Sequence, residues 1–310
     1  MNKFCLLTND VETTSIWHNS LRDETGIKVY KEGMPLLLDL YNEYNIKSTF
    51  FFTGHIANLV PDIVRMILDD GHEVASHGMS HIRTRGFDVM PLKDQIRDLK
   101  KSKEILEDIS GKEVITFRAP ALRVNTNTVA ALEETGYLID SSVASQRFDM
   151  FMSFGSINKL NWLNSPRLPY RTSKNSLFRK GNSNIVEIPL SASILPYVGT
   201  TMRILPYLTI LQRNLLACES QINNKPIVFD VHPNEFIDES NEKQKFDRRA
   251  SNIFASILQD FVRSKLKQKN LGTRGLKIYE REIKYFKKNE FIFSTIKNYY
   301  KKLNLWEYLF

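Results

Sequence analysis

The chain has 310 residues, of which 42% are hydrophobic and 25% charged, and its net charge is +8. This length and composition allow a large buried core in one domain, and the two cysteines exclude a disulfide framework. Within these residues, no uncharged apolar run is long enough to cross a bilayer.

The positive charge is concentrated in the C-terminal part of the chain. Residues 241–310 contain 17 Lys and Arg against 7 Asp and Glu, a net charge of +10, whereas residues 1–240 have a net charge of −2. Such a segment suits an anionic membrane surface or nucleic acid, and it also occurs on solvated, lysine-rich helical faces. Because we find no recognised nucleic-acid-binding motif, we expect no nucleic-acid partner.

The first predicted element is a buried strand over Lys3–Thr8, which leads into Asn9-Asp10-Val11-Glu12. In an extended chain, the side chains of Asp10 and Glu12 point to the same side. Two such carboxylates destabilise a strand end because like charges repel, but they suit a site that holds a metal beside a base. A strand end solvated by polar residues is the alternative interpretation.

A parallel β/α alternation follows this strand. The polar run from Thr13 to Lys31 predicts a long loop, and apolar spacing predicts a helix from about Gly33 to Tyr44. A second buried strand over Ser48–Phe52, an amphipathic helix that ends at Gly71 and a third strand over His72–Ser76 continue the pattern. Strands that alternate with helices in this way are typical of a parallel sheet.

His77 and His81 follow the third strand and are four residues apart. At that spacing both imidazoles can reach one point in space if the backbone turns helically. Two imidazoles that meet at one point suggest a metal site. Two histidines on a solvated helix show the same spacing, so the other polar strand ends decide between the two interpretations.

The rest of the chain repeats the sequence of strand, polar end and helix up to about Ser142, and the pattern then weakens into a long loop from Gln146 to Asn184. We predict helices over about Leu92–Ile109, Asn127–Glu134, Ile204–Ala217, Phe246–Val262, Lys277–Lys287 and Ile296–Leu303. We predict further strands at Ile115–Phe117, Tyr137–Ser142, Ile185–Leu190, Pro226–Val231 and Phe291–Phe293.

Polar residues at successive strand ends are the pattern of a β/α-barrel active site. Five such stretches, in order, resemble the five motifs of the polysaccharide deacetylases, carbohydrate esterase family four: Asn9–Glu12, Ser76–His81, Phe117–Pro120, Tyr137–Ser142 and Asp230–Pro233. Ser48–Phe52, Gly71–Glu73 and Arg203–Tyr207 also resemble the family, so the similarity spans most of residues 3–236. It implies an α/β fold, a distorted barrel of about seven β/α units. We expect one catalytic domain over residues 1–310, with a basic helical segment at about 241–310.

The resemblance implies a role for each matching residue. Asp10 is similar to the family's general base, and His232 is similar to its general acid. Glu12, His77 and His81 are similar to the metal ligands, and the implied metal is a divalent ion, with Zn²⁺ the first choice and Co²⁺ or Ni²⁺ the alternatives. A metal of this kind polarises the acyl carbonyl and lowers the pKa of bound water.

The same resemblance assigns partners to the base and the acid. Arg118 would pair with Asp10 and keep it ionised, and Asp140 would pair with His232 and keep the imidazole protonated at neutral pH. The backbone N–H of Ala121 would donate to the oxyanion, as the corresponding amide does in the family. The pKa values of base and acid are thus tuned in opposite directions.

Several positions depart from the common family pattern. The first motif has the acid-apolar-acid form, with Val11 in the middle, as in one subgroup. Asp230 stands where leucine is usual, two residues before His232, and its side chain faces the same way in an extended strand. Asp230 therefore competes with Asp140 as the partner of the histidine.

Two further departures concern the sugar-binding surface. Ala121 stands where the third motif usually has tyrosine, and Ser141 stands where a tryptophan often lines the groove. We therefore expect less aromatic surface for stacking on a sugar ring. The backbone amide implied as oxyanion donor is unaffected by the first change.

The resemblance predicts a hydrolase of carbon–nitrogen amide bonds that deacetylates an amino sugar in a polysaccharide or a lipid-linked glycan. The alternatives are a deformylase or another amidase on the same barrel, and a catalytically silent sugar-binding barrel. Because Met1–Lys3 leads directly into a strand, we expect no secretory signal and a cytoplasmic protein. The basic segment and the apolar stretch Ile204–Ala217 predict reversible binding to an anionic membrane surface at its inner face.

Overall fold

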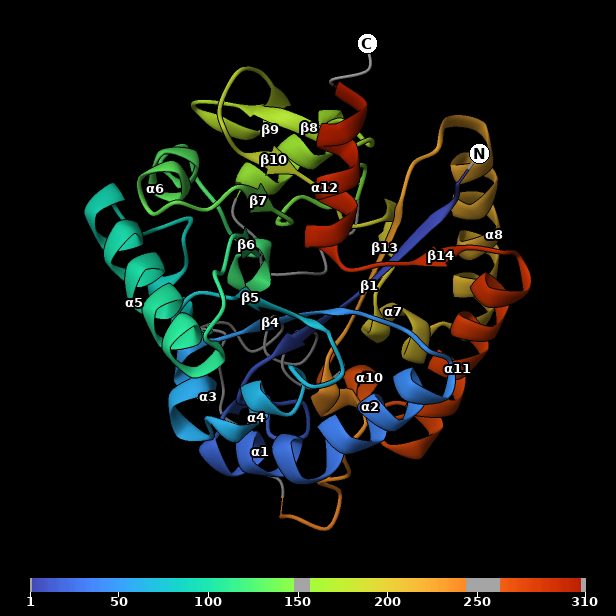
Figure 1. Cartoon of the computed structure of the whole chain (residues 1–310). Helices are drawn as coiled ribbons and strands as arrows, with labels where there is room; N and C mark the ends of the chain where they lie inside the picture. The colour runs from blue at the N-terminus through green and yellow to red at the C-terminus, as the bar shows by residue number, and fades with distance from the viewer. Residues whose placement is uncertain (1, 148–156, 244–262, 308–310) are drawn as a thin grey trace.

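A computed structural model of the chain describes residues 2–147, 157–243 and 263–307. Its centre is a curled sheet in which seven parallel strands lie side by side along the main path (Figure 1). In spatial order they are β13 (Ile227–Val231), β1 (Phe4–Val11), β4 (Thr49–Phe52), β5 (Glu73–Ser76), β6 (Thr116–Phe117), β7 (Ile139–Asp140) and β10 (Val186–Glu187). The predicted α/β fold, with a distorted barrel of parallel strands, is confirmed.

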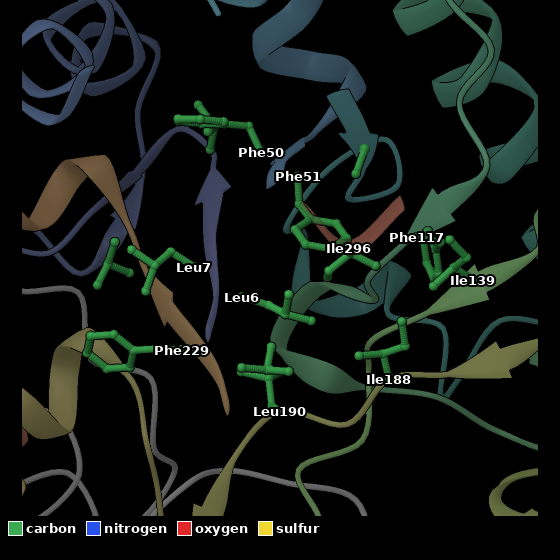
Figure 2. Close-up of a cluster of buried hydrophobic side chains, with 14 of the residues drawn as sticks. Leu6, Leu7, Phe50, Phe51, Phe117, Ile139, Ile188, Leu190, Phe229 and Ile296 are labelled. Atoms are coloured by element: carbon green, nitrogen blue, oxygen red, sulfur yellow. The ribbon is translucent and has the colours of Figure 1, made fainter. Parts of the chain in front are cut away.

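The strands form because their apolar residues can be buried on both faces of the sheet, as is usual for parallel strands. Every residue of β1 is buried. Figure 2 shows Leu6 on one side of β1 with Ile188 and Leu190, and Leu7 on the other side with Phe229. Leu6 therefore packs inside the barrel. Asp10 lies four residues further along β1 and points to the same side, because successive side chains of a strand alternate between its two faces.

Helices connect and cover the strands. The first half of the chain contributes α1 (Asp23–Lys28), the π-helical turn Val29–Gly33, α2 (Met34–Glu43), α3 (Gly54–Leu59), α4 (Asp62–Arg65), α5 (Leu92–Ser110) and α6 (Thr128–Glu134). The second half contributes α7 (Gly199–Ile204), α8 (Pro206–Asn223), α10 (Arg263–Lys267), α11 (Thr273–Lys288) and α12 (Ile296–Glu307). Short 3-10 turns lie at Arg83–Arg85, Pro120–Leu122, Ile157–Asn164 and Pro233–Glu235.

The two edges of the curled sheet are joined or covered. At one edge β10 pairs with β8 (Tyr170–Ser173), which forms an antiparallel hairpin with β9 (Ser176–Lys180). After β10 the chain runs toward β13, where the Ser191 N–H donates to the Val228 carbonyl at 3.1 Å. Small hairpins are formed by β2 (Thr14–Ser15) with β3 (Ser20–Leu21) and by β11 (Ala192–Ser193) with β12 (Leu195–Pro196). The barrel is therefore distorted, because the described residues form no strand ladder between β10 and β13, and hydrogen bonds of Ser191 with Val228 join the segment after β10 to β13.

The end of the chain belongs to the same core. Strand β14 (Ile292–Phe293) pairs in parallel with the start of β1, and the first N–H of α12 donates to Thr49 Oγ1 at 2.9 Å. The helices predicted at Lys277–Lys287 and Ile296–Leu303 correspond to α11 and α12. The helix predicted over Phe246–Val262 lies outside the described residues.

Two loop predictions are wrong. The stretch from Thr13 to Lys31 contains a hairpin and α1, and the loop predicted from Gln146 to Asn184 contains the β8–β9 hairpin in its described part. In the first case, Gly26 weakens the helical signal of α1, yet a Cβ at this glycine would lie 2.8 Å from Thr13 Cγ2. Tertiary packing, which needs the small residue, outweighs the low helix propensity of glycine.

We expect Leu6→Ala to lower the free energy of unfolding by about 2–5 kcal/mol, because it removes a fully buried side chain from inside the barrel. Urea denaturation followed by circular dichroism measures this change. Leu215→Ala is the matched control, since Leu215 is exposed, and its effect should stay within about 0.5 kcal/mol. Equal losses in the two variants would contradict the packing described here.

Candidate active site

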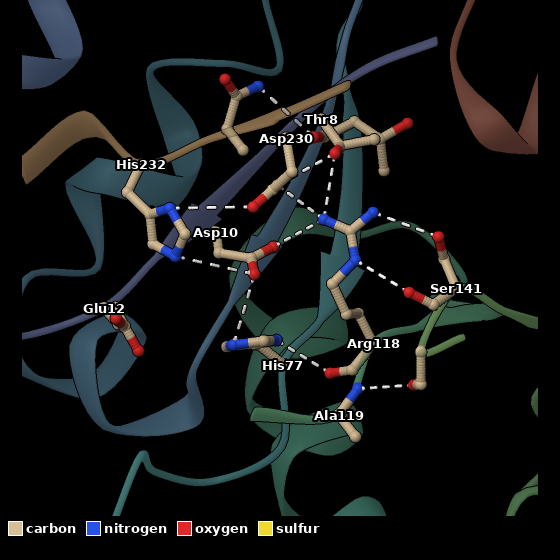
Figure 3. A network of polar contacts seen from close by, with 12 residues as sticks. Thr8, Asp10, Glu12, His77, Arg118, Ala119, Ser141, Asp230 and His232 are labelled. Carbon is tan, nitrogen blue, oxygen red and sulfur yellow. Dashed lines mark hydrogen bonds and ion pairs between the residues drawn. The ribbon is translucent and has the colours of Figure 1, made fainter. Parts of the chain in front are cut away.

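Polar side chains gather at the carboxyl ends of the parallel strands. Because these ends meet at one edge of the sheet, residues far apart in the sequence become neighbours. Figure 3 shows that residues from β1, β13 and the segments after β5 and β6 point toward one another: Asp10, His77, Arg118, Asp230 and His232. All of these residues except Asp230 were predicted as site residues from the sequence.

Glu12, His77 and His81 form a candidate metal centre. Their ligand atoms lie within 4.8 Å of one another, and His81 Nε2 is 3.4 Å from Glu12 Oε2. Among the residues that the structure describes, none is a hydrogen-bond partner of the buried atoms Glu12 Oε2 and His77 Nε2. Two imidazoles and one carboxylate are a ligand set of catalytic zinc sites. These three residues therefore fit a divalent metal ion, as predicted.

The orientation of His77 supports this interpretation. Its Nδ1 lies 2.8 Å from the backbone oxygen of Arg118, so Nδ1 carries the proton and donates to that carbonyl. The other nitrogen, Nε2, then faces Asp10 Oδ2 at 3.6 Å. Burial lowers the pKa of His77, which favours the neutral ring that a metal ligand requires.

Asp10 is held in the ionised state that a general base needs. Burial raises the pKa of a carboxyl group, but the positive charge of Arg118, followed by that of His77, outweighs burial and holds the pKa of Asp10 below its usual range. Arg118 Nη1 donates to Asp10 Oδ1 at 2.8 Å. The predicted pairing of Arg118 with Asp10 is confirmed.

The partner of His232 is Asp230. Asp230 Oδ2 lies 3.7 Å from His232 Nδ1, and Asp230 Oδ1 accepts from Arg118 Nη1 at 2.6 Å. Burial lowers the pKa of His232, but the charges of Asp230 and Asp10 outweigh it and raise the pKa above its usual value. The prediction that Asp140 pairs with His232 is wrong. Asp230, the alternative partner named in the sequence analysis, lies beside the imidazole instead.

Asp140 instead forms a buried pair of carboxyl groups with Glu187, which the sequence analysis missed. The two residues are in register across β7 and β10, and both are buried. Burial, followed by the charge of Asp140, raises the pKa of Glu187 well above its usual value. This environment therefore favours the protonated form of Glu187.

Asp140 also supports the segment after β6. Asp140 Oδ1 accepts from the Ser142 hydroxyl at 2.8 Å, and the Ser142 oxygen accepts from the Ala119 N–H at 2.8 Å. Two residues further on, Ala121 has a left-handed backbone with φ 53°, which is uncommon outside glycine and turns the chain sharply. The predicted role of the Ala121 amide as oxyanion donor stays a prediction.

Glu235 is a second residue that the sequence analysis missed. The His232 N–H donates to Glu235 Oε2 at 3.2 Å, and the buried Arg203 donates to Glu235 Oε1 from Nε at 3.0 Å and from Nη2 at 2.8 Å. A Cβ at Gly199 would lie only 1.9 Å from Glu235 Oε2. Glu235 thus anchors the backbone of His232. The sequence feature that could have identified Glu235 is its position three residues after His232.

Comparison with known proteins shows what part of this chain is similar to. Residues 23–139, which include both metal-site histidines and Arg118, match the family model described as polysaccharide deacetylase. Over these residues the chain is similar to the polysaccharide deacetylase family. A peptidoglycan deacetylase from Helicobacter pylori is 28% identical over 189 residues, which cover 58% of this chain and 62% of that protein. The chain thus spans less than two thirds of the length of this relative.

Solved structures of the deacetylase type share the fold. A structure titled "probable polysaccharide deacetylase" from Pseudomonas aeruginosa PAO1 has a TM-score of 0.57 and 15% identity, and the match covers 95% of this chain and 88% of that chain. The structure of PuuE allantoinase has a TM-score of 0.58 and 16% identity, with 96% and 88% covered. At this level of identity, the likeness concerns the fold alone.

We expect Glu187→Gln to make stability less dependent on pH. Because the folded state raises the pKa of Glu187, it keeps a proton that the unfolded chain releases above the usual carboxyl range. This stabilisation is present at low pH and is lost as the pH rises. Between about pH 5 and about pH 8, the free energy of unfolding should therefore fall more in the wild type than in the variant. Urea unfolding at both pH values tests this, with the exposed Glu104→Gln as control. Identical pH slopes in all three proteins would contradict the raised pKa of Glu187.

We also expect Asp230→Asn to lower the pKa of the His232 imidazole, because the carboxylate nearest to Nδ1 loses its charge. Asp140→Asn should leave that pKa close to the wild-type value. An NMR titration of the imidazole resonances compares the two variants directly. A larger decrease in Asp140→Asn would restore Asp140 as the partner.

Proposed function

We propose that the protein is a metal-dependent deacetylase that removes the N-acetyl group from an amino sugar in a polysaccharide or a lipid-linked glycan. The observation that carries this proposal is the position of Asp10, between the candidate metal centre and the imidazole of His232. The similarity of residues 23–139 to the polysaccharide deacetylase family supports hydrolysis of an amide bond. The Helicobacter pylori relative, named for peptidoglycan deacetylation, supports an acetylated cell-wall glycan as the substrate class.

Glu12, His77 and His81 are the residues that would hold the ion, which we propose to be Zn²⁺. When bound, such an ion supplies a Lewis acid for the acyl carbonyl and lowers the pKa of water. The neutral ring of His77 and its hydrogen bond to the Arg118 carbonyl keep one ligand oriented before any metal arrives.

The protein's own residues then move two protons. Asp10, kept ionised by Arg118, takes a proton from the attacking water as the water oxygen bonds to the acyl carbon. His232, protonated beside Asp230, gives a proton to the sugar nitrogen as the carbon–nitrogen bond breaks. The products are acetate and a free amino sugar. Asp10 Oδ2 and His232 Nε2 lie 3.9 Å apart, so base and acid face the same reacting group.

Replacing His77 and His81 together with alanine should abolish metal binding and acetate release. Asp10→Asn should retain the metal but lower turnover by roughly 10²–10⁴-fold, because the general base is lost. Metal analysis of protein purified without a chelator and acetate release from acetylated glycans measure the two effects. His55→Ala, which replaces an exposed histidine paired with Asp23, is the control and should change neither.

The assay also separates the alternatives. Formate release from an N-formyl amino sugar would identify a deformylase, and hydrolysis of a small ureide would identify an amidase of the kind named in the allantoinase structure. Metal binding without turnover on any of these substrates would indicate a silent barrel. Full metal occupancy in the double histidine variant would contradict the proposed centre.

A further inference from the structure

Helix α8 is turned so that its apolar side faces outward. Its exposed side chains include Tyr207, Leu211, Leu215 and Ile222, which are 85%, 62%, 66% and 77% exposed. These residues follow one another at intervals of four, four and seven, so they lie on one face of the helix. The structure describes all eighteen residues of α8. Its two charged residues, Arg213 and Glu219, both form ion pairs with residues outside the helix.

The polar side chains of α8 hold it to the protein. Gln212 Nε2 donates to the Leu195 carbonyl at 2.6 Å, and Glu219 accepts from Arg167 and Lys225 at 2.5 Å and 2.9 Å. A surface helix normally buries its apolar side and exposes its polar side. The opposite arrangement leaves a row of large apolar groups in water, which on a protein surface marks an interaction site.

Helix α11 is the neighbour of α8 and carries a basic surface. Arg213 of α8 pairs with Glu282 of α11 at 3.0 Å, and its guanidinium lies 3.8 Å from the centre of the Tyr285 ring. Apart from Thr273, the exposed residues of α11 are all cations: Arg274, Lys277, Arg281, Lys284, Lys287 and Lys288. Figure 1 shows both helices along the same side of the molecule.

We propose that the outward face of α8 and the basic face of α11 form one surface that docks on an anionic lipid membrane. The apolar side chains enter the headgroup region, and the cations contact lipid phosphates, which is the composition of a helix that lies in a membrane interface. The described residues include no helix long and apolar enough to span a bilayer, so the contact is peripheral. This proposal is independent of the proposed reaction.

A second copy of the chain fits the surface less well than a membrane does. In a symmetric dimer built on α8, the same patch of both copies meets, so the two basic faces of α11 lie beside one shared interface. Like charges at an interface oppose association. Anionic lipid, in contrast, complements both the apolar row and the cations.

Co-sedimentation with vesicles tests the proposal. The full chain should bind vesicles of phosphatidylcholine with about 30% phosphatidylglycerol, and salt should release it, because the cations act through screened charge. Binding to phosphatidylcholine alone should be roughly tenfold weaker or more. Absence of binding to the anionic vesicles at low ionic strength would overturn the proposal.

Two variants locate the surface. L211Q with L215Q removes apolar side chains, and R274Q with K277Q and R281Q removes three cations; each should lower the vesicle partition coefficient roughly tenfold. K174Q with R179Q and K180Q removes three exposed cations at the β8–β9 hairpin and should bind as the wild type does. Equal loss in this control would show binding by net charge alone and overturn the proposed surface.

Sedimentation velocity tests whether a second copy of the chain binds the outward face of α8. The protein should be monomeric without vesicles at the concentrations used, and all variants should keep wild-type acetate release from a soluble substrate, because none of these residues lies in the candidate active site. A dimer that L211Q with L215Q dissociates would assign the α8 face to a second copy and overturn the membrane proposal.

Discussion

The buried guanidinium of Arg118 is the group on which the site depends. It has no solvent exposure, and a charge in that position is stable only if anions and acceptors surround it closely. Asp10, Asp230 and Thr8 accept from Nη1, and Ser141 accepts from Nε and Nη2. One side chain thus ties together the ends of β1 and β13 and the segment after β7. The carbonyl of Arg118 accepts from the ring of His77, so a change at Arg118 alters both the charge balance of the site and the orientation of this candidate ligand.

Much of this arrangement was predictable from the sequence, because a parallel sheet brings the ends of its strands to one edge whatever their separation in the chain. Buried strand patterns located β1, β4 and β5, and the polar residues after them identified Asp10, Glu12, His77 and His81 before any coordinates. The C-terminal end of α5 was predictable for a local reason: Gly111 takes the left-handed conformation that ends a helix.

The remaining errors have one physical cause, which is that register and packing between distant segments leave little local signal. The family resemblance implied Asp140 as the partner of His232, but the pairing of β7 with β10 places Asp140 opposite Glu187 instead. The anchoring of His232 by Glu235 depends on Arg203, which reaches it from another helix. In the same way, the sequence showed that Ile204–Ala217 is apolar, but only the packing of α8 shows that the apolar side faces outward.

The position of β1 has a consequence for how the protein is made. This strand leaves the ribosome well before two of its partners, residues 227–231 and 292–293. At about 5–20 residues per second, translation keeps the N-terminal strand waiting on the order of tens of seconds for these partners. During that interval an apolar strand has unpaired backbone on at least one side, which is the kind of edge that aggregates or recruits chaperones. Folding of the sheet is therefore completed only after β14 has been synthesised, and a chain truncated before β14 lacks a neighbour for the strand that carries Asp10.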